Sequence, residues 1–546
     1  MFTAVDRPPR RAALSRTSDG TVQPSAQRRL RPLVDGERRW VAWGGPVGVA
    51  LLALVLRLWQ LGRPGTLLFD ETYYAKDAYS LLRFGYVRDT VENADRMVAR
   101  GDLTGLFKAD TSYYVHPDVG KWLIAAGEWA FGMDPFGWRV SAAVVGSLTV
   151  LVLARLVRRL TGSTLLGCVA GLLLCFDGLH FVMSRLALLD VFMAFFLVCA
   201  VACLAADRDW GRSRLLRLTG ADRPTAGGWG PVRALLLRPW RLAAGVSFGL
   251  ACGTKWNAIF ALAGFGLLVW AWDCGARRAV GVRAPAWKAT LVDAVPAFFS
   301  LVGVALLVYV VSWTGWFANV QKYETDFGSD WGTYLATDAS GPEEVVQSVR
   351  SLWEYHQEVW SFHTGSDIQD ATHPYESDPA GWLVINRPVG IDANTDIQPG
   401  QLGCVAPDKC IEQILAIGTP VLWWAGAVAL LAGGAYWVGG RDWRFGLALV
   451  GVLSSWLPWL FFSERPIFFF YAVSIIPFTV VALTLVLGKI LGPADAGRRR
   501  RAWGAAVVGA FVALVVANFA FFHPILTDGL LTNEDWLDRM WFARWI

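Results

Sequence analysis

Residues 138–159 read WRVSAAVVGSLTVLVLARLVRR, and their pattern decides the fold class. Between Arg139 and Arg155 every side chain is apolar or small, and the stretch approaches the ~20 residues that a helix needs to cross a bilayer. Its second end is strongly basic, because Arg155, Arg158 and Arg159 stand there together. Since short loops rich in Arg and Lys stay in the cytoplasm, the stretch predicts a spanning helix that runs inward.

Similar apolar runs recur along the chain, and its composition agrees with them. Of its 546 residues, 54% are hydrophobic and only 17% are charged, against about 25% in ordinary soluble domains. The 29 Trp residues are typical of aromatic belts at two membrane surfaces. We therefore predict an all-α polytopic membrane protein. About eleven spanning helices are expected, over residues 41–61, 138–158, 163–181, 185–206, 240–252, 255–273, 290–312, 413–438, 443–462, 466–490 and 502–523.

The charges of the loops predict which side each one occupies. Residues 1–40 are polar and rich in Arg, which predicts a disordered cytoplasmic tail; a nucleic-acid-binding arm is not expected directly before a spanning helix. Basic loops precede and follow 240–273, so the chain must cross an even number of times between them. With eleven crossings, every short basic loop lies inside and the tail 524–546 lies outside.

Two long segments, 62–137 and 313–412, then lie outside the cell. Segment 313–412 is acidic, with sixteen Asp and Glu against four Lys and Arg. Both are too long for plain connectors, which indicates a functional role. Residues 120–131 are apolar but short, and we interpret them as a re-entrant or surface helix. The chain thus divides into an N-terminal transmembrane module over 41–312, the acidic loop 313–412, and C-terminal helices over 413–523.

Cys404 and Cys410 stand together in the acidic outer loop. Disulfides form and persist in such oxidising surroundings. No His residues accompany the two cysteines at the spacing of a zinc site. A short-loop disulfide is therefore favoured over a metal site here.

Two adjacent carboxylates, Asp70 and Glu71, open the first outer segment. A carboxylate near an interface, partly removed from water, has a raised pKa and can act as a general base. The same pair could hold a divalent cation. It could also be an acidic cap at the start of a solvent-exposed helix, because carboxylates stabilise helix N-termini. The residue types alone favour this last interpretation.

The context of the pair adds to the argument, because further blocks follow it in a characteristic order. The blocks are Asp70-Glu71, His116-Pro117-Asp118-Val119-Gly120-Lys121-Trp122, Asp134-Pro135-Phe136-Gly137-Trp138-Arg139, Phe176-Asp177-Gly178-Leu179-His180, Ser184-Arg185-Leu186-Ala187-Leu188-Leu189-Asp190 and Gly253-Thr254-Lys255-Trp256-Asn257. In this order and spacing the chain resembles the protein O-mannosyltransferase family, with the glycosyltransferase type C fold. The resemblance extends over about residues 41–523.

The resemblance implies an inverting enzyme of a bacterial inner membrane, with its active site facing outward. It implies transfer of mannose from polyprenyl-phosphate-mannose to Ser or Thr hydroxyls of secretory proteins as they emerge from the secretion channel. Asp70 matches the family's catalytic aspartate, which takes the proton of the acceptor hydroxyl. Glu71 matches its neighbour, which positions acceptor or donor. The chemistry agrees, because a hydroxyl is a poor nucleophile until a base removes its proton.

Cations near the outer surface are candidates for the donor phosphate, whose departing charge they would stabilise. Arg139 and Arg57 match functional arginines of the family. Arg139 could equally anchor a helix end at the interface, whereas an Arg at membrane depth such as Arg57 is costly and usually functional.

Three further cations are candidates with open alternatives. Arg185 reaches the phosphate or, as we slightly prefer, pairs with Asp190 five residues later. Lys255 stands at a break between two helices and is a phosphate ligand or an end anchor. Arg465 lies in an outer turn before an aromatic stretch, where family members often carry His but this chain has none.

Three other residues of the blocks are expected to support the site. His116 and His180 could titrate near neutral pH, but hydrogen-bonding structural roles are preferred. Lys121 is expected to support the structure as well. No cofactor is predicted. Asp-Glu pairs bind divalent ions, but arginines alone can serve a monophosphate leaving group, so a metal is not favoured.

Two alternative functions differ in what the chain acts on. Related type C enzymes use the same donors to glycosylate a lipid or a cell-wall glycan. The blocks around Lys121 and Arg185 favour a protein acceptor. A transporter or lipid flippase is the other alternative, but such proteins usually show repeated halves and broken helices, and this sequence shows no internal repeat.

Overall fold

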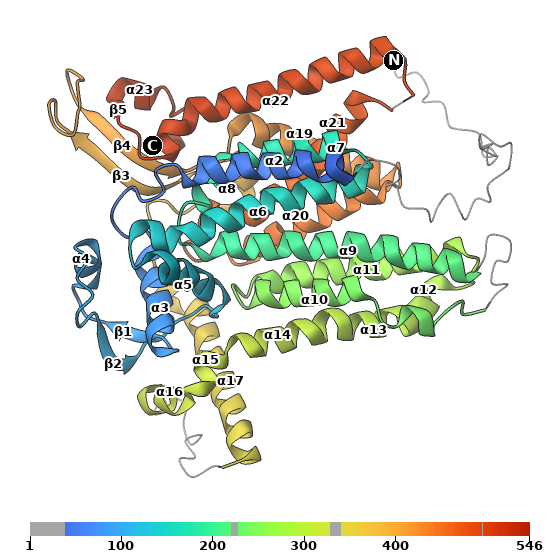
Figure 1. The fold of residues 1–546 in the computed structure, drawn as a ribbon, viewed down its shortest axis with the longest axis horizontal. Helices are drawn as coiled ribbons and strands as arrows, with labels where there is room; N and C mark the ends of the chain where they lie inside the picture. Colours follow the sequence, from blue (N-terminus) through green and yellow to red (C-terminus); the bar gives the residue numbers. More distant parts are fainter. Residues whose placement is uncertain (1–38, 220–227, 328–339, 494) are drawn as a thin grey trace.

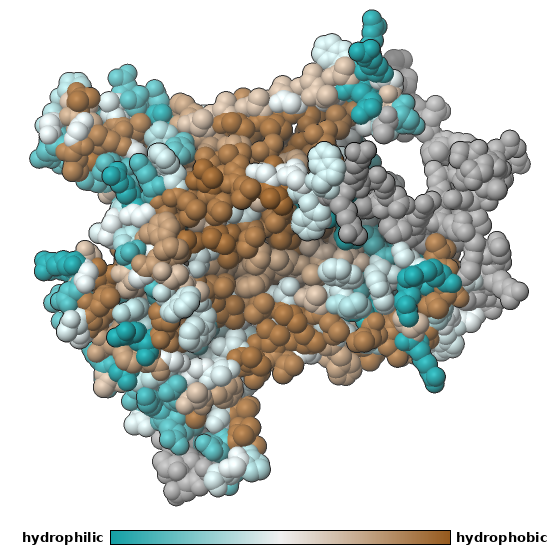
Figure 2. Space-filling view, viewed as in Figure 1, coloured by the Kyte–Doolittle hydropathy of each residue, from teal (hydrophilic) through white to brown (hydrophobic). Residues whose placement is uncertain are grey.

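The computed structural model describes residues 39–219, 228–327, 340–493 and 495–546, so nearly all of the predicted tail 1–40 lies outside it. Long helices run side by side in one direction and form the body of the molecule (Figure 1). Hydrophobic side chains gather around the middle of this bundle, and hydrophilic side chains gather toward its two ends (Figure 2). This distribution is that of a protein whose helices cross a bilayer.

Eight helices of the described residues are long and apolar enough to cross a membrane. They are α2 (Arg39–Leu58), α6 (Pro135–Thr161), α9 (Leu189–Thr219), α11 (Ala258–Ala279), the continuous segment Pro285–Ser312, α19 (Pro420–Val438), α20 (Trp443–Phe461) and α22 (Arg498–Leu526). Three shorter helices, α7 (Thr164–Cys175), α10 (Pro239–Cys252) and α21 (Ile476–Leu491), occupy the other predicted spans. The helical membrane architecture is confirmed, while the count of eleven crossings stays a prediction.

The predicted helix 163–181 is interrupted in its second half. Helix α7 ends at Cys175, and a separate short helix, α8 (Gly178–Met183), follows it. The Asp177 carboxylate caps α8 by accepting a hydrogen bond from the His180 backbone N–H at 2.8 Å. It also accepts a 2.7 Å hydrogen bond from the Trp423 indole N–H, which ties this break to α19.

Two other predicted helices start later than expected. Within 413–438, strand β4 (Cys410–Ala416) comes first and α19 begins only at Pro420. Within 466–490, a 3₁₀ helix, η5 (Phe469–Ser474), precedes α21. Proline at the first turn suits a helix start, because its missing N–H would have no intrahelical partner there.

One end of the bundle carries the segments that were expected outside the membrane (Figure 1). The first segment contributes α3 (Glu71–Phe84), β1 (Arg88–Thr90), α4 (Ala94–Ala99), β2 (Phe107–Thr111) and α5 (Val119–Phe131). The second segment contributes α15 (Thr314–Ala318), α16 (Val320–Phe327), α17 (Pro342–Thr364), α18 (Ser366–Gln369), η4 (Pro379–Val384) and β3 (Val389–Ile397). The two small antiparallel sheets, β1-β2 and β3-β4-β5, were not expected in an all-α chain; β5 (Leu531–Thr532) and α23 (Asn533–Leu537) come from the C-terminal tail.

Helix α5 was predicted to lie at the surface or to re-enter it. Its 13 residues make about 20 Å of helix, which is shorter than the ~30 Å hydrocarbon core. It packs against α3 and α6 at the end of the bundle (Figure 1). The Val119 backbone N–H donates to the Gly253 carbonyl at 3.1 Å, which joins α5 to the break between α10 and α11. The structure thus places α5 beside the outer segments.

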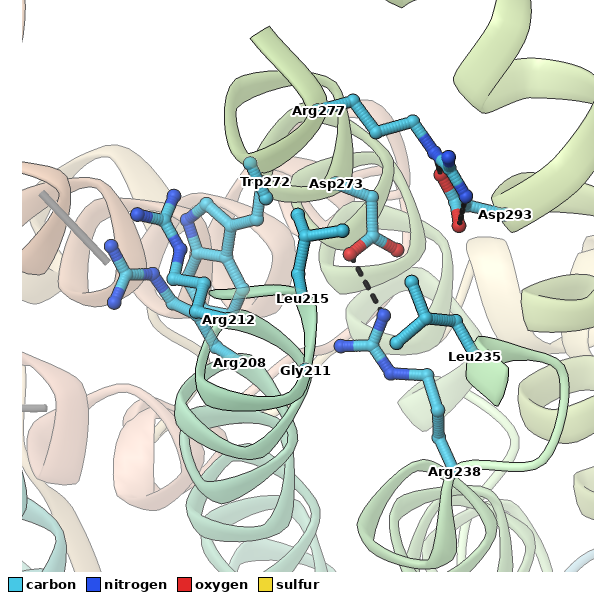
Figure 3. Close-up of a pocket in the computed structure, with 11 residues that line it drawn as sticks. Arg208, Gly211, Arg212, Leu215, Leu235, Arg238, Trp272, Asp273, Arg277 and Asp293 are labelled. Carbon is cyan, nitrogen blue, oxygen red and sulfur yellow. Dashed lines mark hydrogen bonds and ion pairs between the residues drawn. The ribbon is translucent and has the colours of Figure 1, made fainter. Parts of the chain in front are cut away.

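The opposite end of the bundle carries a network of buried ion pairs. Arg238 donates to Asp207 at 2.8 Å and to Asp273 at 2.9 Å. Arg241 also contacts both carboxylates, with its closest distance, 2.7 Å, to Asp273. Figure 3 shows Arg238 and Asp273 at the small pocket that they line between α9, α10 and α11. Arg238, which was expected in a basic loop, and Arg241, inside the predicted span 240–252, therefore bind three helices together.

Candidate active site

Asp70 stands at the N-terminus of α3, directly after the loop that leaves α2. The preceding residue, Phe69, has φ +50°, a left-handed conformation that is costly for a bulky side chain. Its ring packs edge-on against Phe468 and Phe470, each at 5.5 Å between centroids. Aromatic packing thus holds the unusual turn that orients Asp70.

The Asp70 carboxylate is partly buried among titratable groups from three elements. Burial raises its pKa to about 6; Asp190 also raises it, while Lys255 and the Tyr74 hydroxyl act to lower it. The Tyr74 hydroxyl lies 3.5 Å from the nearer carboxylate oxygen, a long hydrogen bond. At neutral pH this carboxylate is ionised and still basic enough to accept a proton, as a general base must be.

Glu71, in contrast, has every oxygen occupied within the protein. Arg139 contacts it with two parallel hydrogen bonds, from Nε to Oε1 at 2.8 Å and from Nη2 to Oε2 at 2.7 Å. The backbone N–H groups of Leu68 and Ala187 donate to the same carboxylate at 3.0 and 2.9 Å. Glu71 is fully buried. It therefore joins the start of α3 to α6 and to the loop before α9.

The rest of the Arg139 guanidinium is also engaged by the protein. It donates to the carbonyl oxygens of Leu61, Pro64 and Thr66, at 3.4, 2.8 and 2.9 Å. With the two bonds to Glu71, all five N–H groups of the guanidinium have an acceptor. This geometry favours a positioning role for Arg139 and leaves no N–H directed to a phosphate.

Lys255 lies beside Asp70 and is buried. Its ammonium donates to both carboxylate oxygens of Asp190, at 3.0 and 2.9 Å, and lies 4.7 Å from the centre of the Tyr471 ring. The expected pairing of Arg185 with Asp190 is therefore wrong, because Lys255 occupies that carboxylate. The pair sets one cation close to the base.

Arg57 and Arg185 hold the end of α2. The buried Arg57 guanidinium lies 2.9 Å from Nδ1 of His180, an interaction that agrees with the structural role expected for this histidine. Arg185 donates to the carbonyls of Arg57 and Trp59, at 2.9 and 2.6 Å, and to that of Gln60 at 3.2 Å. These carbonyls belong to the last turn of α2 and to the two residues after it, where no intrahelical donor remains. Arg185 therefore fixes the start of the loop that leads to Asp70, and Arg57 joins the end of α2 to α8.

Arg465 is the remaining predicted phosphate ligand. Its Nη1 lies 2.9 Å from Nδ1 of His363, on the last turn of α17. Its Nε has no hydrogen-bond partner among the described residues. His363 stacks on His116 at 6.0 Å between ring centroids, and burial lowers the pKa of both imidazoles. Two neutral histidines and a cation with an unused donor thus lie near the Asp70 site.

Lys121 supports the outer segment, as expected. Its ammonium lies 3.0 Å from Asp77 on α3 and 3.7 Å from the centre of the Tyr114 ring. Asp118, 3.9 Å away, has a pKa raised to about 7 by burial, although the Lys121 charge acts to lower it. These contacts hold α5 against α3.

The predicted disulfide is present: Cys404 and Cys410 are bonded and lie next to strand β4. Within the described ranges, no three His, Cys, Asp or Glu side chains gather as a metal site requires.

Comparison with known proteins gives the chain its relatives. Residues 47–221 match the family described as dolichyl-phosphate-mannose-protein mannosyltransferase. A polyprenol-phosphate-mannose–protein mannosyltransferase of Mycobacterium tuberculosis is 37% identical over 538 residues, which cover 97% of this chain and 95% of the relative. The chain belongs to the protein mannosyltransferase family. The corresponding enzyme of Mycolicibacterium smegmatis is 38% identical over 515 residues, 92% of this chain and 93% of its own length.

A solved structure shares the fold of this family member. The S. cerevisiae protein O-mannosyltransferase Pmt1–Pmt2 complex bound to the sugar donor superposes with a TM-score of 0.68. The match covers 96% of this chain and 95% of the yeast chain at 13% identity, so it concerns the fold alone. It confirms the type C architecture that the sequence motifs predicted.

Several residues of this family member's candidate site were missed in the sequence. Tyr74 follows Asp70 by four residues and Tyr471 lies in the aromatic stretch after Arg465, but nothing in their spacing indicated that both would lie near the Asp70 carboxylate. His363 lies in the acidic segment, 247 residues after its stacking partner His116. Only the return of α17 to the end of the bundle brings these two histidines together.

Proposed function

We propose that this chain is an inverting glycosyltransferase that moves mannose from polyprenyl-phosphate-mannose to Ser or Thr hydroxyls of secreted proteins. The observation that carries the proposal is the contrast within the Asp70-Glu71 pair. Glu71 is locked by Arg139 and two backbone N–H groups, whereas Asp70 is accessible and has a pKa raised to about 6. The mycobacterial relatives, named for this donor and for protein acceptors, support the choice of substrates.

The reaction that we propose is a single displacement. Asp70 takes the proton of the acceptor hydroxyl while its oxygen attacks the anomeric carbon of mannose. The bond from that carbon to the phosphate oxygen breaks, and its electron pair leaves with the polyprenyl phosphate. The proton on Asp70 is then released to water. A phosphate is already a good leaving group, so only its charge needs stabilisation.

Two cations are placed to stabilise that charge. Lys255 lies beside Asp70 and Asp190, and Arg465 keeps an unused Nε donor beside His363. We propose these two as the phosphate ligands. Arg139 and Arg185 act as positioning residues, because they donate to carbonyl groups around the loop that ends at Asp70. Arg57 is held within the protein by the Ala53 carbonyl and His180, although its Nε has no hydrogen-bond partner among the described residues.

The proposal includes a location and an acceptor route. We propose a multi-pass protein of a bacterial inner membrane, with a cytoplasmic N-terminus and the Asp70 side facing outward. The basic residues near the ends of α9 and α11, at the end of the bundle opposite α3 (Figure 1), support this orientation. The acceptor would arrive unfolded from the secretion channel and meet the acidic segment 313–412, which is long enough to contribute to acceptor selection.

The test uses membranes that contain the full chain, labelled polyprenyl-phosphate-mannose and a Ser/Thr-rich secretory peptide. Wild type should label the peptide, and Asp70→Asn should lose ~10²-fold or more of the rate, the usual range for a general base. Asp89→Asn is a matched control, because the one ion pair that Asp89 forms with the described residues is a 3.8 Å surface contact with Lys108. Labelling of lipid or glycan in place of peptide would refute the protein acceptor.

A further inference from the structure

Helix α17 has three distinct sides along its 23 residues, about 34 Å of helix. One side packs on the protein through the buried Leu352, Tyr355 and Val359. A second side is polar and includes Arg350 and Glu354. The third side consists of large apolar residues and is not covered by any described part of the chain.

This third side, which we call the α17 stripe, is unusual in its exposure. Each of its members has more than half of its surface exposed. The stripe consists of Val345, Val346, Val349, Trp353 and Trp360. Spacings of four, four and seven residues from Val345 through Val349 and Trp353 to Trp360 place these side chains on one face. A soluble surface rarely keeps such a row of large apolar groups in water.

The position of α17 relates the stripe to the lipid-facing surface of the bundle. Helix α17 runs across the outer end of the bundle and projects beyond it (Figure 1). In Figure 2, the projecting part of the molecule has brown, hydrophobic atoms on the edge turned toward the membrane-spanning length of the bundle. Hydrophilic atoms gather on its opposite edge. The apolar side of α17 therefore faces the space that lipid occupies around the bundle.

Contacts join the stripe to an apolar surface that lies in the membrane. His356, next to the stripe on the helix, hydrogen-bonds the hydroxyl of Tyr309 on α14 (Val304–Ser312). On α14, the side chains of Leu306, Leu307 and Val311 are each at least 60% exposed. Side chains that face lipid are exposed in this way when the chain is considered without its membrane. Helix α17 is thus attached, next to its stripe, to a helix whose exposed apolar side chains face lipid.

We propose that α17 is an interfacial membrane helix, and that its stripe lies in the lipid leaflet on the Asp70 side of the membrane. An amphipathic helix that lies in the interface plane buries its apolar side among acyl chains and keeps its polar side in water. Trp353 and Trp360 suit this depth, because Trp prefers the boundary between hydrocarbon and headgroups. The attachment to α14 favours lipid as the occupant over a second protein.

The placement has a consequence for the active site, and this part rests on the proposed function. The last turn of α17 carries His363, which holds Arg465, and its middle carries Tyr355, which binds the Tyr114 backbone. Lipid contact with the stripe thus fixes Arg465 relative to Asp70. Val349→Glu combined with Trp353→Glu should raise KM for the lipid donor severalfold with little change of kcat, whereas Glu354→Gln on the polar side should leave both unchanged.

The direct test reads lipid contact and needs no activity. The photoreactive residue p-benzoylphenylalanine replaces Trp353 in the full chain, which is reconstituted in vesicles of phosphatidylglycerol and phosphatidylethanolamine and irradiated. The same residue replaces Leu307 on α14 as a positive control and Glu354 as a control on the polar side of α17. Mass spectrometry then counts phospholipid adducts at each position.

We expect phospholipid adducts at positions 353 and 307 and at least fivefold fewer at position 354. Adducts between two protein chains at position 353, or adducts at 307 without any at 353, would overturn the proposal. If the chain proves unable to transfer mannose, the adduct pattern still decides whether α17 lies in the lipid. The two proposals therefore fail separately.

Discussion

At the scale of single residues, two neighbouring carboxylates have different roles because their surroundings differ. Glu71 accepts two hydrogen bonds from Arg139 and two from backbone N–H groups, and these four bonds fix its position. Asp70 has one long hydrogen bond and loses hydration, so burial raises its pKa to about 6. Pairs of titratable groups with divergent environments are how enzymes separate acid–base work from structural work.

The pKa of Asp70 predicts how activity depends on pH. Because a general base works only when it is ionised, kcat/KM should fall tenfold per pH unit below about pH 6 and level off above it. The measurement is the initial rate of peptide mannosylation in vesicles from pH 4.5 to 8.5. A rate that stays constant down to pH 5 would exclude Asp70 as the titrating base.

Tyr74 provides a way to assign that titration to Asp70. Its hydroxyl hydrogen-bonds the ionised carboxylate and thereby acts to lower the pKa of Asp70. Tyr74→Phe removes this bond, so the pKa should rise and the acid limb of the rate profile should move to higher pH. Phe keeps the ring that packs in the outer segment. An unchanged limb, with Tyr74→Phe folded and active, would assign the titration to another group.

The pair of Glu71 and Arg139 predicts a large loss of stability when one partner is removed. Both side chains are at most 1% exposed, so Glu71→Gln leaves a buried charge without its counterion. Breaking a buried pair in this way typically costs about 3–5 kcal/mol. Thermal unfolding in detergent should show the loss for Glu71→Gln and also for Arg139→Lys, which cannot form two parallel bonds. A melting temperature equal to that of wild type would contradict the positioning role.

At the scale of elements, the break between α7 and α8 shows how a close contact sets a helix boundary. A Cβ at Gly178 would lie 2.5 Å from the Ile417 carbonyl oxygen, and backbone cannot move aside as a flexible side chain can. The approach brings α8 next to the start of α19, where Asp177 accepts its bond from Trp423. The boundary thus depends on a contact between segments 239 residues apart.

Gly178→Ala should therefore destabilise the protein and reduce its activity, although Ala favours helices over Gly. Gly48→Ala on α2 is the matched control, because nothing lies within 4 Å of its added Cβ, and it should be neutral or stabilise by about 0.5–1 kcal/mol. Both variants are compared by thermal unfolding and by mannosylation rate. Equal behaviour of the two would show that the Ile417 contact does not limit the packing of α8.

These elements show which parts of the fold the sequence could predict. Long apolar runs such as 138–158 are specified by local hydropathy alone, and the structure confirms their helices. The break at Asp177 and the strand at 410–416 depend on distant partners, so local patterns could not predict them. At the site, the family motifs selected Asp70 and Glu71, but the partner of Asp190 was wrong. Which cation reaches a carboxylate depends on how helices pack, and Lys255 arrives from a different helix break.

At the scale of the whole molecule, the direction of the chain agrees with the predicted topology. Helix α2 starts at the end of the bundle opposite α3, and the C-terminus lies at the α3 end (Figure 1). The chain therefore crosses the bundle an odd number of times from α2 to its end. The arginines drawn in Figure 3 belong to the part of the bundle where α9 ends and α11 leads into α12, and Figure 1 shows this part at the end where α2 starts. Because positive loops stay inside, this end should be cytoplasmic and the Asp70 end external.

Reporter fusions test this orientation directly. Alkaline phosphatase needs disulfides, which form only outside the cytoplasm, so it should be active when fused after Ile546. It should be inactive when it replaces the chain after Ala279, at the end of α11. Green fluorescent protein at the same two positions should give the opposite pattern. Alkaline phosphatase that is active after Ala279 and inactive after Ile546 would show the opposite orientation in the membrane, with Asp70 facing the cytoplasm. That result would remove the argument for acceptors that emerge from the secretion channel.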